Sequence, residues 1–232
     1  MNDSVLEISN LTKKYDNLVA VDGFNLRLKQ GTVHGLVGPN GAGKSTMLSI
    51  ISGLRRKTSG SINFGVAQKE IMLMPDTPDF FGFLTARQIV DLARSPFLHN
   101  ISEERVEKVI DAVGLSNSID LKVKGFSRGM KQRLGLATTI ISQPKLILLD
   151  EPCSALDPIG RHDVLEIVSE LKNNSTVLFS THILSDVEAV CDSVTVVDHG
   201  KTLYEGTVSD ISDGKKSFED AVIALLRPKK EL

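Results

Sequence analysis

The chain has 232 residues, of which 41% are hydrophobic and 24% charged, and its formal net charge is −2. This length is sufficient for a sizeable core, in one domain or in one domain with two lobes. The small net charge excludes a global attraction to nucleic acid or anionic lipid, so such a partner would need a local basic patch.

The sequence shows no pattern typical of a membrane-spanning helix, a signal peptide or a pair of bonded cysteines. It contains no apolar run as long as the 18 or so residues that a membrane-spanning helix requires. The start, "MNDSVLEISN", has neither the basic region nor the apolar run of a signal peptide. Cys153 and Cys191 have no CxxC spacing and are expected to be free thiols in a reducing cytoplasm.

The first third of the chain is predicted to be rich in strands. Residues 5–9 and 24–29 alternate between apolar and polar side chains, as half-buried strands do. Residues 33–37, "VHGLV", form a short apolar run that ends at a glycine and predict a buried strand. Further short strands are expected at 61–64 and 71–74.

Residues 77–145 are predicted to be helical, and strands and helices alternate after them. Helices are expected at 85–93, which opens with Thr85 and Gln88 in capping-box spacing, and at 102–113. Later strands are expected at 146–149, 176–180 and 194–197, with helices at 159–172 and 184–191. A last helix, at 217–226, is expected to pack through Phe218, Ala221, Val222 and Leu225. This order predicts an α/β fold with a mainly parallel sheet and a helical insertion.

The segment "GPNGAGKST" satisfies the pattern G-x-x-x-x-G-K-[ST] between a predicted strand and a predicted helix. Its glycines allow backbone N–H groups to point inward at phosphate oxygens, and the following helix adds its N-terminal dipole. We prefer this interpretation to a glycine-rich turn with a chance lysine, because many constrained positions match in the right context. The sequence therefore predicts nucleoside triphosphate binding by Gly38, Pro39, Asn40, Gly41, Ala42, Gly43, Lys44, Ser45 and Thr46, with the Ser45 hydroxyl on Mg²⁺.

Two further strands are expected to end beside this loop. Asp150 and Glu151 follow the apolar run 146–149, and His182 follows the strand at 176–180. The carboxyl ends of strands in α/β sheets are where ligands bind. Asp150 is expected to serve the Mg²⁺ shell and Glu151 to accept the proton of the attacking water. The alternatives are solvated charges at a strand end and an ordinary surface or core histidine.

The ordered set "GPNGAGKST", "FSRGMKQRL", "LILLDEP", "SALDP" and "STH" resembles the ATPase domain of ABC transporters over nearly the whole chain. The resemblance implies a P-loop NTPase core with an N-terminal antiparallel β subdomain and an inserted α-helical subdomain. It implies one domain over 1–232: a core lobe at 1–76 and 146–215, a helical signature subdomain at 77–145, and a C-terminal helix and tail at 216–232. It also implies that Tyr15 stacks on adenine and that Glu151 and His182 are the catalytic base and the switch histidine.

The same resemblance gives roles to two more loops. The signature motif, commonly LSGGQ, is represented by Ser127, Arg128, Gly129 and Met130 at the start of a helix, and it is expected to bind ATP held by an opposite subunit. The dimer loop that links the two subunits is represented by Ser154, Ala155, Leu156 and Asp157. Within the basic stretch that follows the signature, Lys131 and Arg133 are expected to be solvated helix charges. Arg128 departs from the family pattern and adds bulk near the expected interface.

A second departure lies after the strand at 71–74, where Asp76 replaces the usual glutamine of the family. Asp76 is expected to contact Mg²⁺ through water, with a simple turn cap as the alternative. Phe80, Phe81 and Phe83 follow it. By analogy with the family, Asp76–Phe83 docks a membrane permease subunit, although a core role for some of these phenylalanines is an equal alternative.

These features predict the ATP-binding and ATP-hydrolysing subunit of an ABC transporter, of an exporter type similar to drug, antimicrobial-peptide or sodium efflux systems. ATP and Mg²⁺ are the implied cofactors. A second copy of the subunit and separate membrane permease subunits are the implied partners, with no nucleic acid. The implied location is cytoplasmic, on the inner face of the cell membrane. The alternatives are a soluble ABC-type ATPase acting on ribosomes or DNA, and a slow nucleotide-gated regulatory module.

Overall fold

The computed structural model describes residues 3–97, 101–211 and 217–227, and every structural statement below refers to them. Its main element is a sheet whose strands run in the order β5-β6-β7-β3-β8-β9. The first five are parallel, and β9 joins β8 antiparallel. Their bounds are β3 Val33–Val37, β5 Ile71–Met74, β6 Leu146–Asp150, β7 Thr176–Thr181, β8 Ser193–Asp198 and β9 Lys201–Thr207.

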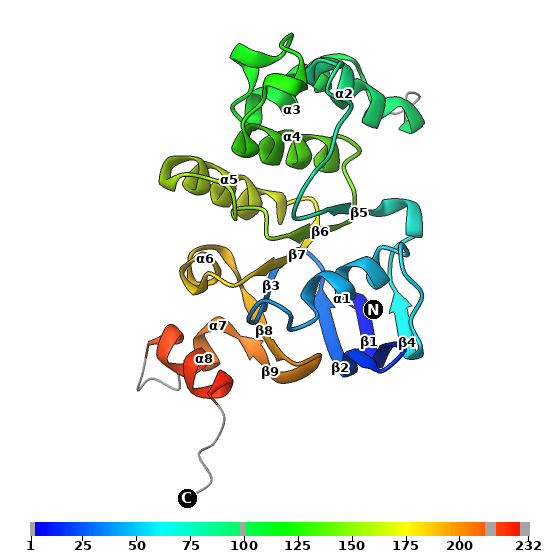
Figure 1. The fold of residues 1–232 in the computed structure, drawn as a ribbon, viewed down its shortest axis with the longest axis vertical. Helices are drawn as coiled ribbons and strands as arrows, with labels where there is room; N and C mark the ends of the chain where they lie inside the picture. The colour runs from blue at the N-terminus through cyan, green and yellow to red at the C-terminus, as the bar shows by residue number, and fades with distance from the viewer. Residues whose placement is uncertain (1–2, 98–100, 212–216, 228–232) are drawn as a thin grey trace, which may run out of the picture.

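A smaller antiparallel sheet comes from the N-terminal part of the chain, with strand order β2-β1-β4. Its strands are β1 Ser4–Tyr15, β2 Leu18–Lys29 and β4 Ser59–Phe64. Side chains of β1 and β2 form one apolar cluster with helix α1, Lys44–Ile51, and with Leu146 and Leu148 of the larger sheet. The small sheet and α1 therefore cover one face of the larger sheet (Figure 1).

The opposite face of the larger sheet packs on helices. The alternate residues of β6, Ile147 and Leu149, point into a second cluster that includes side chains of α4 and α5. This alternation follows from the two-residue period of a strand, which places successive side chains on opposite faces. Helix α5 spans Pro158–Leu171, α6 Leu184–Val190, α7 Val208–Ile211 and α8 Phe218–Leu226.

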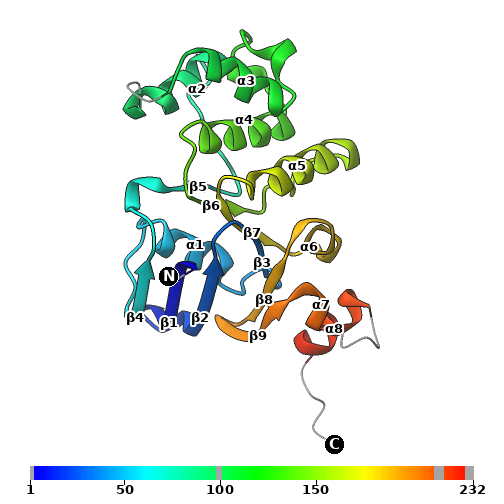
Figure 2. The same ribbon diagram turned by 180° about the vertical axis from the view of Figure 1, so that it is seen from behind.

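A helical segment lies between β5 and β6 in the chain and at one end of the long axis of the molecule (Figures 1 and 2). It contains α2 Ala86–Arg94, α3 Glu104–Ala112 and α4 Arg128–Ile140. Thr85 caps α2 by accepting the Gln88 amide, and the Gln88 side chain accepts the Thr85 amide, so the predicted capping box is confirmed. The predicted fold class, a mainly parallel sheet with an antiparallel N-terminal sheet and inserted helices, is also confirmed.

The last part of the chain differs from the sequence-based prediction in two ways. Strand β9 and the short helix α7 were not predicted, because the half-exposed alternation of 201–207 contains no apolar run. In α8, Phe218 and Val222 are buried as predicted, but Leu225 is 37% exposed and Leu226 packs on the same cluster instead. The packing face thus follows the four-residue spacing from Phe218 through Val222 to Leu226.

Candidate nucleotide site

The phosphate loop connects the buried strand β3 to helix α1. Gly43, the N-cap of α1, has φ 97°, and a Cβ there would lie 2.4 Å from the Ala20 carbonyl oxygen. The loop closes around Lys44, which is only 6% exposed. The Lys44 ammonium donates to the carbonyl oxygens of Gly38, at 2.7 Å, and Pro39, at 3.3 Å. A cation is therefore held at the base of the loop, close to the first turn of α1.

A cavity of about 430 Å³ opens in front of this loop. One side is formed by the loop, from Pro39 to Thr46, and the other is an apolar wall of Tyr15 and its neighbours in and beside β2. The Tyr15 hydroxyl accepts a hydrogen bond from Arg55 at 2.9 Å, which fixes the ring at the cavity wall. The remaining lining residues are Leu18, Val19, Ala20, Asp76, Glu151 and His199. A cationic loop opposite an aromatic and aliphatic wall fits a nucleotide, with its phosphates and its base at opposite ends.

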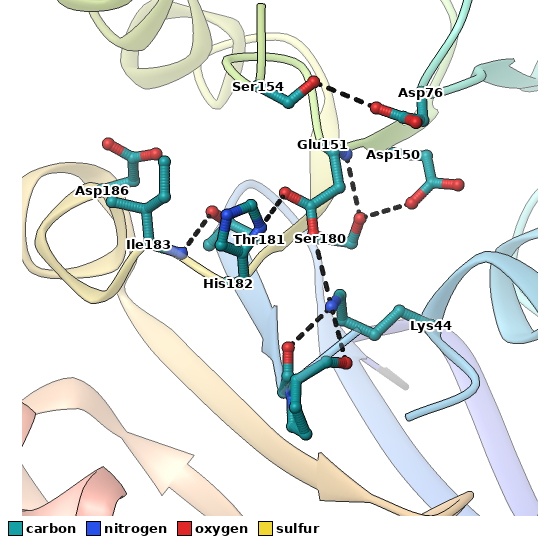
Figure 3. Close-up of polar contacts among 12 residues, drawn as sticks. Lys44, Asp76, Asp150, Glu151, Ser154, Ser180, Thr181, His182, Ile183 and Asp186 are labelled. Carbon is teal, nitrogen blue, oxygen red and sulfur yellow. Dashed lines mark hydrogen bonds and ion pairs between the residues drawn. The ribbon is translucent and has the colours of Figure 1, made fainter. Parts of the chain in front are cut away.

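Glu151 lies between Lys44 and His182 (Figure 3). One carboxylate oxygen, Oε2, is 2.8 Å from His182 Nδ1, and the other, Oε1, is 3.3 Å from the Lys44 ammonium. The Lys44 contact is an ion pair without hydrogen-bond geometry, since Oε1 has no hydrogen-bond partner among the described residues. This carboxylate is therefore oriented by one hydrogen bond and keeps one oxygen able to accept a proton or a water.

The backbone of Glu151 is held in an unusual conformation. Its φ is 49°, in the left-handed region that non-glycine residues seldom occupy. The Glu151 amide donates to both the carbonyl and the hydroxyl oxygen of Ser180, at 3.1 and 3.0 Å, and its carbonyl accepts from Gln132 Nε2 at 3.2 Å. Backbone strain that several hydrogen bonds maintain is typical of functional sites. Here it aims the Glu151 side chain at the cavity.

Three oxygen-bearing residues were predicted to hold Mg²⁺, and they occupy different depths. Ser45 and Asp76 line the cavity, whereas Asp150 lies behind it, 6% exposed, and accepts the Ser180 hydroxyl at 2.6 Å. No group of three or more His, Cys, Asp or Glu residues in the described part of the chain is arranged as a metal cage. Such a sparse oxygen set suits Mg²⁺, which keeps several waters and takes phosphate oxygens as ligands.

The signature residues do not line the nucleotide cavity of their own chain. Ser127 is the N-cap of α4, and its hydroxyl oxygen accepts the Met130 amide at 3.1 Å. Gly129 lies against the dimer loop, where a Cβ would come within 3.2 Å of the Leu156 side chain. Ser154 of that loop donates to Asp76 at 3.0 Å, and Asp157 caps α5 by accepting the Gly160 amide at 2.7 Å. The signature and the dimer loop thus contact each other, and none of their residues lines the nucleotide cavity.

One basic residue of the signature helix is placed differently from the prediction. Arg133 is only 22% exposed and forms an ion pair with Asp163, at 3.6 Å. A Cβ at Gly114 or Gly160 would lie 2.8 or 2.6 Å from its guanidinium. The expectation of a solvated charge is therefore wrong for Arg133, because two glycines distant in the sequence make room for it between α3 and α5.

Several residues of the site were missed from the sequence. Ser180 and Gln132 clamp the Glu151 backbone, and His199 lines the cavity at a turn with φ 45°. The serine that ends the apolar strand at 176–180 was a usable signal for Ser180. No local pattern marks Gln132 or His199, because only the tertiary fold brings Gln132 to the Glu151 backbone and His199 to the cavity.

Both cysteines are free thiols, as predicted. Burial raises the pKa of the Cys153 thiol to about 12, and the nearby Asp186 carboxylate adds to the effect. Burial also raises the pKa of Cys191. Because the thiolate is the reactive form, neither group is equipped to act as a nucleophile at neutral pH.

A phosphate loop between a buried strand and a helix, with acidic and histidine side chains at the carboxyl edge of a parallel sheet, defines a P-loop nucleotide hydrolase. The family model described as ABC transporter matches residues 21–154. The chain belongs to this family, as an ATP-binding and ATP-hydrolysing subunit.

Similar proteins agree with this assignment. The chain is 37% identical to the lantibiotic transport ATP-binding protein SrtF of Streptococcus pyogenes, over 93% of this chain and 95% of that protein. It is 36% identical to the bacitracin transport ATP-binding protein BcrA of Bacillus licheniformis, over 87% of this chain and 69% of that one. A solved ATP-binding subunit of an ABC transporter superposes with a TM-score of 0.86 at 27% identity, over 96% of this chain and 100% of that one. These comparisons do not favour the alternative role on ribosomes or DNA.

Proposed function

We propose that this subunit drives an ABC exporter for antimicrobial peptides, through ATP-dependent pairing of two copies that act on separate membrane-spanning subunits. The names of the lantibiotic and bacitracin transport relatives support the substrate class. No helix in the described residues is both long and apolar enough to cross a membrane.

One observation supports the pairing of two copies: the signature residues lie outside the nucleotide cavity of their own chain. Ser127 and the first turn of α4 present a hydroxyl and a positive helix end, yet they line no part of the cavity that holds Lys44. A second copy, turned head to tail, supplies its signature to this cavity and receives the same in return. Pairing of this kind completes two sites at once.

Within each half-site the residues have distinct roles in our proposal. Tyr15 stacks on adenine, Lys44 and the loop amides bind phosphate, and Glu151 accepts the proton of the attacking water. His182 orients Glu151 through their 2.8 Å contact. Ser45, together with Asp150 and Asp76 through water, would hold Mg²⁺, which when bound would supply positive charge next to the phosphates. Residues 77–145 then act as the helical lobe that transmits the closure of the dimer. The core lobe consists of residues 1–76 and 146–215, and residues 216–232 form the C-terminal segment.

Glu151→Gln tests this assignment. Because the amide keeps the size of the side chain but cannot accept a proton, turnover is expected to fall about 10² to 10⁴-fold, with ATP binding retained. With ATP and Mg²⁺ present, light scattering should then report a species of twice the 25.2 kDa chain mass. Wild-type turnover in this variant would remove Glu151 from the role of base, and a monomer with bound ATP would contradict the pairing.

The surface for the membrane subunit is proposed around Phe81 and Phe83. Their side chains are 61% and 68% exposed with ring centroids 5.7 Å apart, whereas Phe80 packs on the core cluster. Beside them, a groove of about 460 Å³ is lined mainly by apolar side chains of this segment and α2. Exposed aromatic side chains next to an apolar groove are typical of a helix-docking surface.

Co-purification with the membrane-spanning subunit tests this surface. The double variant Phe81→Ser/Phe83→Ser should lose association with membranes that contain that subunit, since the aromatic anchors are removed. Leu121→Ser is the matched control, because Leu121 is also an exposed apolar residue, 56% exposed, of the helical segment. Equal membrane association of both variants would place the docking surface elsewhere.

A further inference from the structure

Asp186 is a fully buried carboxylate four residues after His182, in the first turn of α6. The turn between them is fixed by local hydrogen bonds. The Ile183 amide donates to the Thr181 hydroxyl at 3.0 Å, and the Asp186 amide donates to the Ile183 carbonyl at 3.2 Å. Figure 3 shows this turn beside the pair of His182 and Glu151. The position of Asp186 is therefore tied to the segment that presents His182.

The partner of Asp186 comes from the helix behind the dimer loop. Arg161, in the first turn of α5, donates from Nε to Asp186 Oδ1 and forms an ion pair with the same oxygen through Nη2. Its Nη2 also donates to the Ser185 hydroxyl at 2.7 Å. The Arg161 amide donates to the Asp157 carbonyl at 2.9 Å, so a backbone hydrogen bond joins the first turn of α5 to the end of the dimer loop. The ion pair thus joins the dimer loop to the turn that carries His182.

The pair is not arranged for maximal stability. Asp186 Oδ2 is buried and has no hydrogen-bond partner among the described residues, so half of the carboxylate is uncompensated. Burial raises the pKa of Asp186, against the opposing effect of Arg161, and the Glu151 charge adds to the rise. Apolar residues of similar volume often replace such buried pairs without loss of stability. A buried charge of this kind at the junction of two functional loops favours a role in positioning.

We propose that Arg161 and Asp186 are positioning residues, which hold the hydrogen-bonded pair of His182 and Glu151 in register with the dimer loop. A partner subunit that contacts the dimer loop then acts on the geometry of the hydrolytic pair through this bridge. The inference rests on the roles proposed above for Glu151 and His182, and it concerns turnover rather than nucleotide binding.

Arg161→Lys and Asp186→Asn test the bridge, since each weakens the directional contact while keeping a polar side chain. Expected results are a fall of kcat of about tenfold or more, with the dissociation constant for a fluorescent ATP analogue unchanged within about twofold. The ring resonances of His182, assigned by comparison with His182→Gln, should shift in both variants. Arg87→Lys is the matched control: Arg87 forms two ion pairs within the helical segment, and its substitution should leave kcat and these resonances unchanged.

A double variant keeps the test decisive if the single variants unfold. Arg161→Met/Asp186→Leu removes both charges and should fold, because no unpaired charge remains. Its kcat should stay as low as that of the single variants despite restored thermal stability. Wild-type kcat in the folded double variant would overturn the bridge. Full turnover of His182→Ala would instead overturn the proposed role of His182.

Discussion

The carboxyl edge of the six-stranded sheet and the first turn of α4 are both equipped for phosphate, yet they differ in what completes them. The sheet edge places Glu151 in contact with both Lys44 and His182, and the three residues follow three different strands. The α4 end carries Ser127 as its N-cap, and Ser127 does not line the nucleotide cavity of the same chain. One region is assembled by the fold of a single chain, and in our proposal the other acts only beside a second chain.

This difference separates binding from turnover in physical terms. A nucleotide can be held by the sheet edge alone, since the cationic loop and the Tyr15 wall lie in one cavity. Charge that develops during phosphoryl transfer needs further donors. Those donors are on the α4 end in our proposal, so substitutions in the two regions should affect different measurements.

The prediction with the largest expected effect is a substitution at the α4 end that lowers turnover. Ser127→Arg should lower turnover by at least about 10³-fold, the scale of a phosphate-stabilising group supplied in trans, because a bulky cation then fills the position meant for the partner's ATP. ATP binding by the monomer should remain within about twofold of wild type. Steady-state hydrolysis and binding of a fluorescent ATP analogue provide the two measurements.

The control for Ser127→Arg is Ser217→Arg. Ser217 caps α8 as Ser127 caps α4, by accepting a backbone amide three residues later. Both variants lose an N-cap worth about 1 kcal/mol, so any stability effect is matched. A normal turnover rate in Ser127→Arg would refute the shared site, whereas a loss in both variants would reduce the effect to capping.

The second prediction concerns a substitution at the sheet edge that weakens ATP binding. Lys44→Ala should weaken ATP binding about 10²-fold, because charge-assisted hydrogen bonds to phosphate are each worth about 1.5 to 3 kcal/mol. Turnover falls as a consequence of the loss of binding. Lys108→Ala, which removes an exposed lysine paired with Glu104, is the control. Equal ATP affinity in the two variants would contradict the placement of the phosphates on the loop.

The two regions also differ in how far the sequence alone predicted them. The phosphate loop was predictable because strand, glycines, lysine and helix are contiguous, and the structure places Lys44 at its centre. The strands that lead to Glu151 and His182 were recognisable as apolar runs. Their convergence required only the rule that parallel strands place their carboxyl ends at one edge.

Other features depend on contacts between distant segments and were not predictable. Arg133 has the sequence signature of a solvated helix charge, and only the space at Gly114 and Gly160 shows that it packs between α3 and α5. Asp186 likewise resembles an ordinary acidic residue of a first helical turn until its pairing with Arg161 is known. The hydrogen bond from Ser154 to Asp76 joins residues 78 positions apart.

The third prediction concerns the stability of the six-stranded sheet that carries this edge. His34 of β3 is buried and bonded through its ring nitrogens to Ser193 and Thr195, at 2.7 and 2.8 Å, and burial lowers its pKa from 6.5 to about 3. The folded state therefore binds fewer protons than the unfolded state between these values. The stabilisation that the neutral ring provides is complete above about pH 6.5 and is lost as the pH falls toward 3.

Between pH 7 and pH 5, wild type should lose about 2 kcal/mol of unfolding free energy relative to His34→Gln. Urea unfolding at the two pH values measures the difference, and it does so independently of any constant effect of the substitution. His162→Gln, at an exposed histidine, should follow wild type. Parallel pH profiles for wild type and His34→Gln would show that His34 takes up its proton over the same pH range in the folded and in the unfolded protein.

The smallest expected effect lies where the two regions meet, at Asp76. Its carboxylate lines the nucleotide cavity and accepts the hydroxyl of Ser154 from the dimer loop, so it contacts both the cavity and that loop.

Asp76→Asn keeps the shape of the side chain but removes its charge, which for a partly exposed group is worth at most about 1 kcal/mol. The Mg²⁺ concentration for half-maximal hydrolysis should rise less than about tenfold, with turnover at saturating Mg²⁺ nearly unchanged. Asp79→Asn is the control, since Asp79 accepts the amide of its neighbour Phe80 and does not line the nucleotide cavity. An unchanged Mg²⁺ dependence would leave Asp76 as a link between the two loops, whereas a shift confined to Asp76→Asn would make the junction itself part of the metal site.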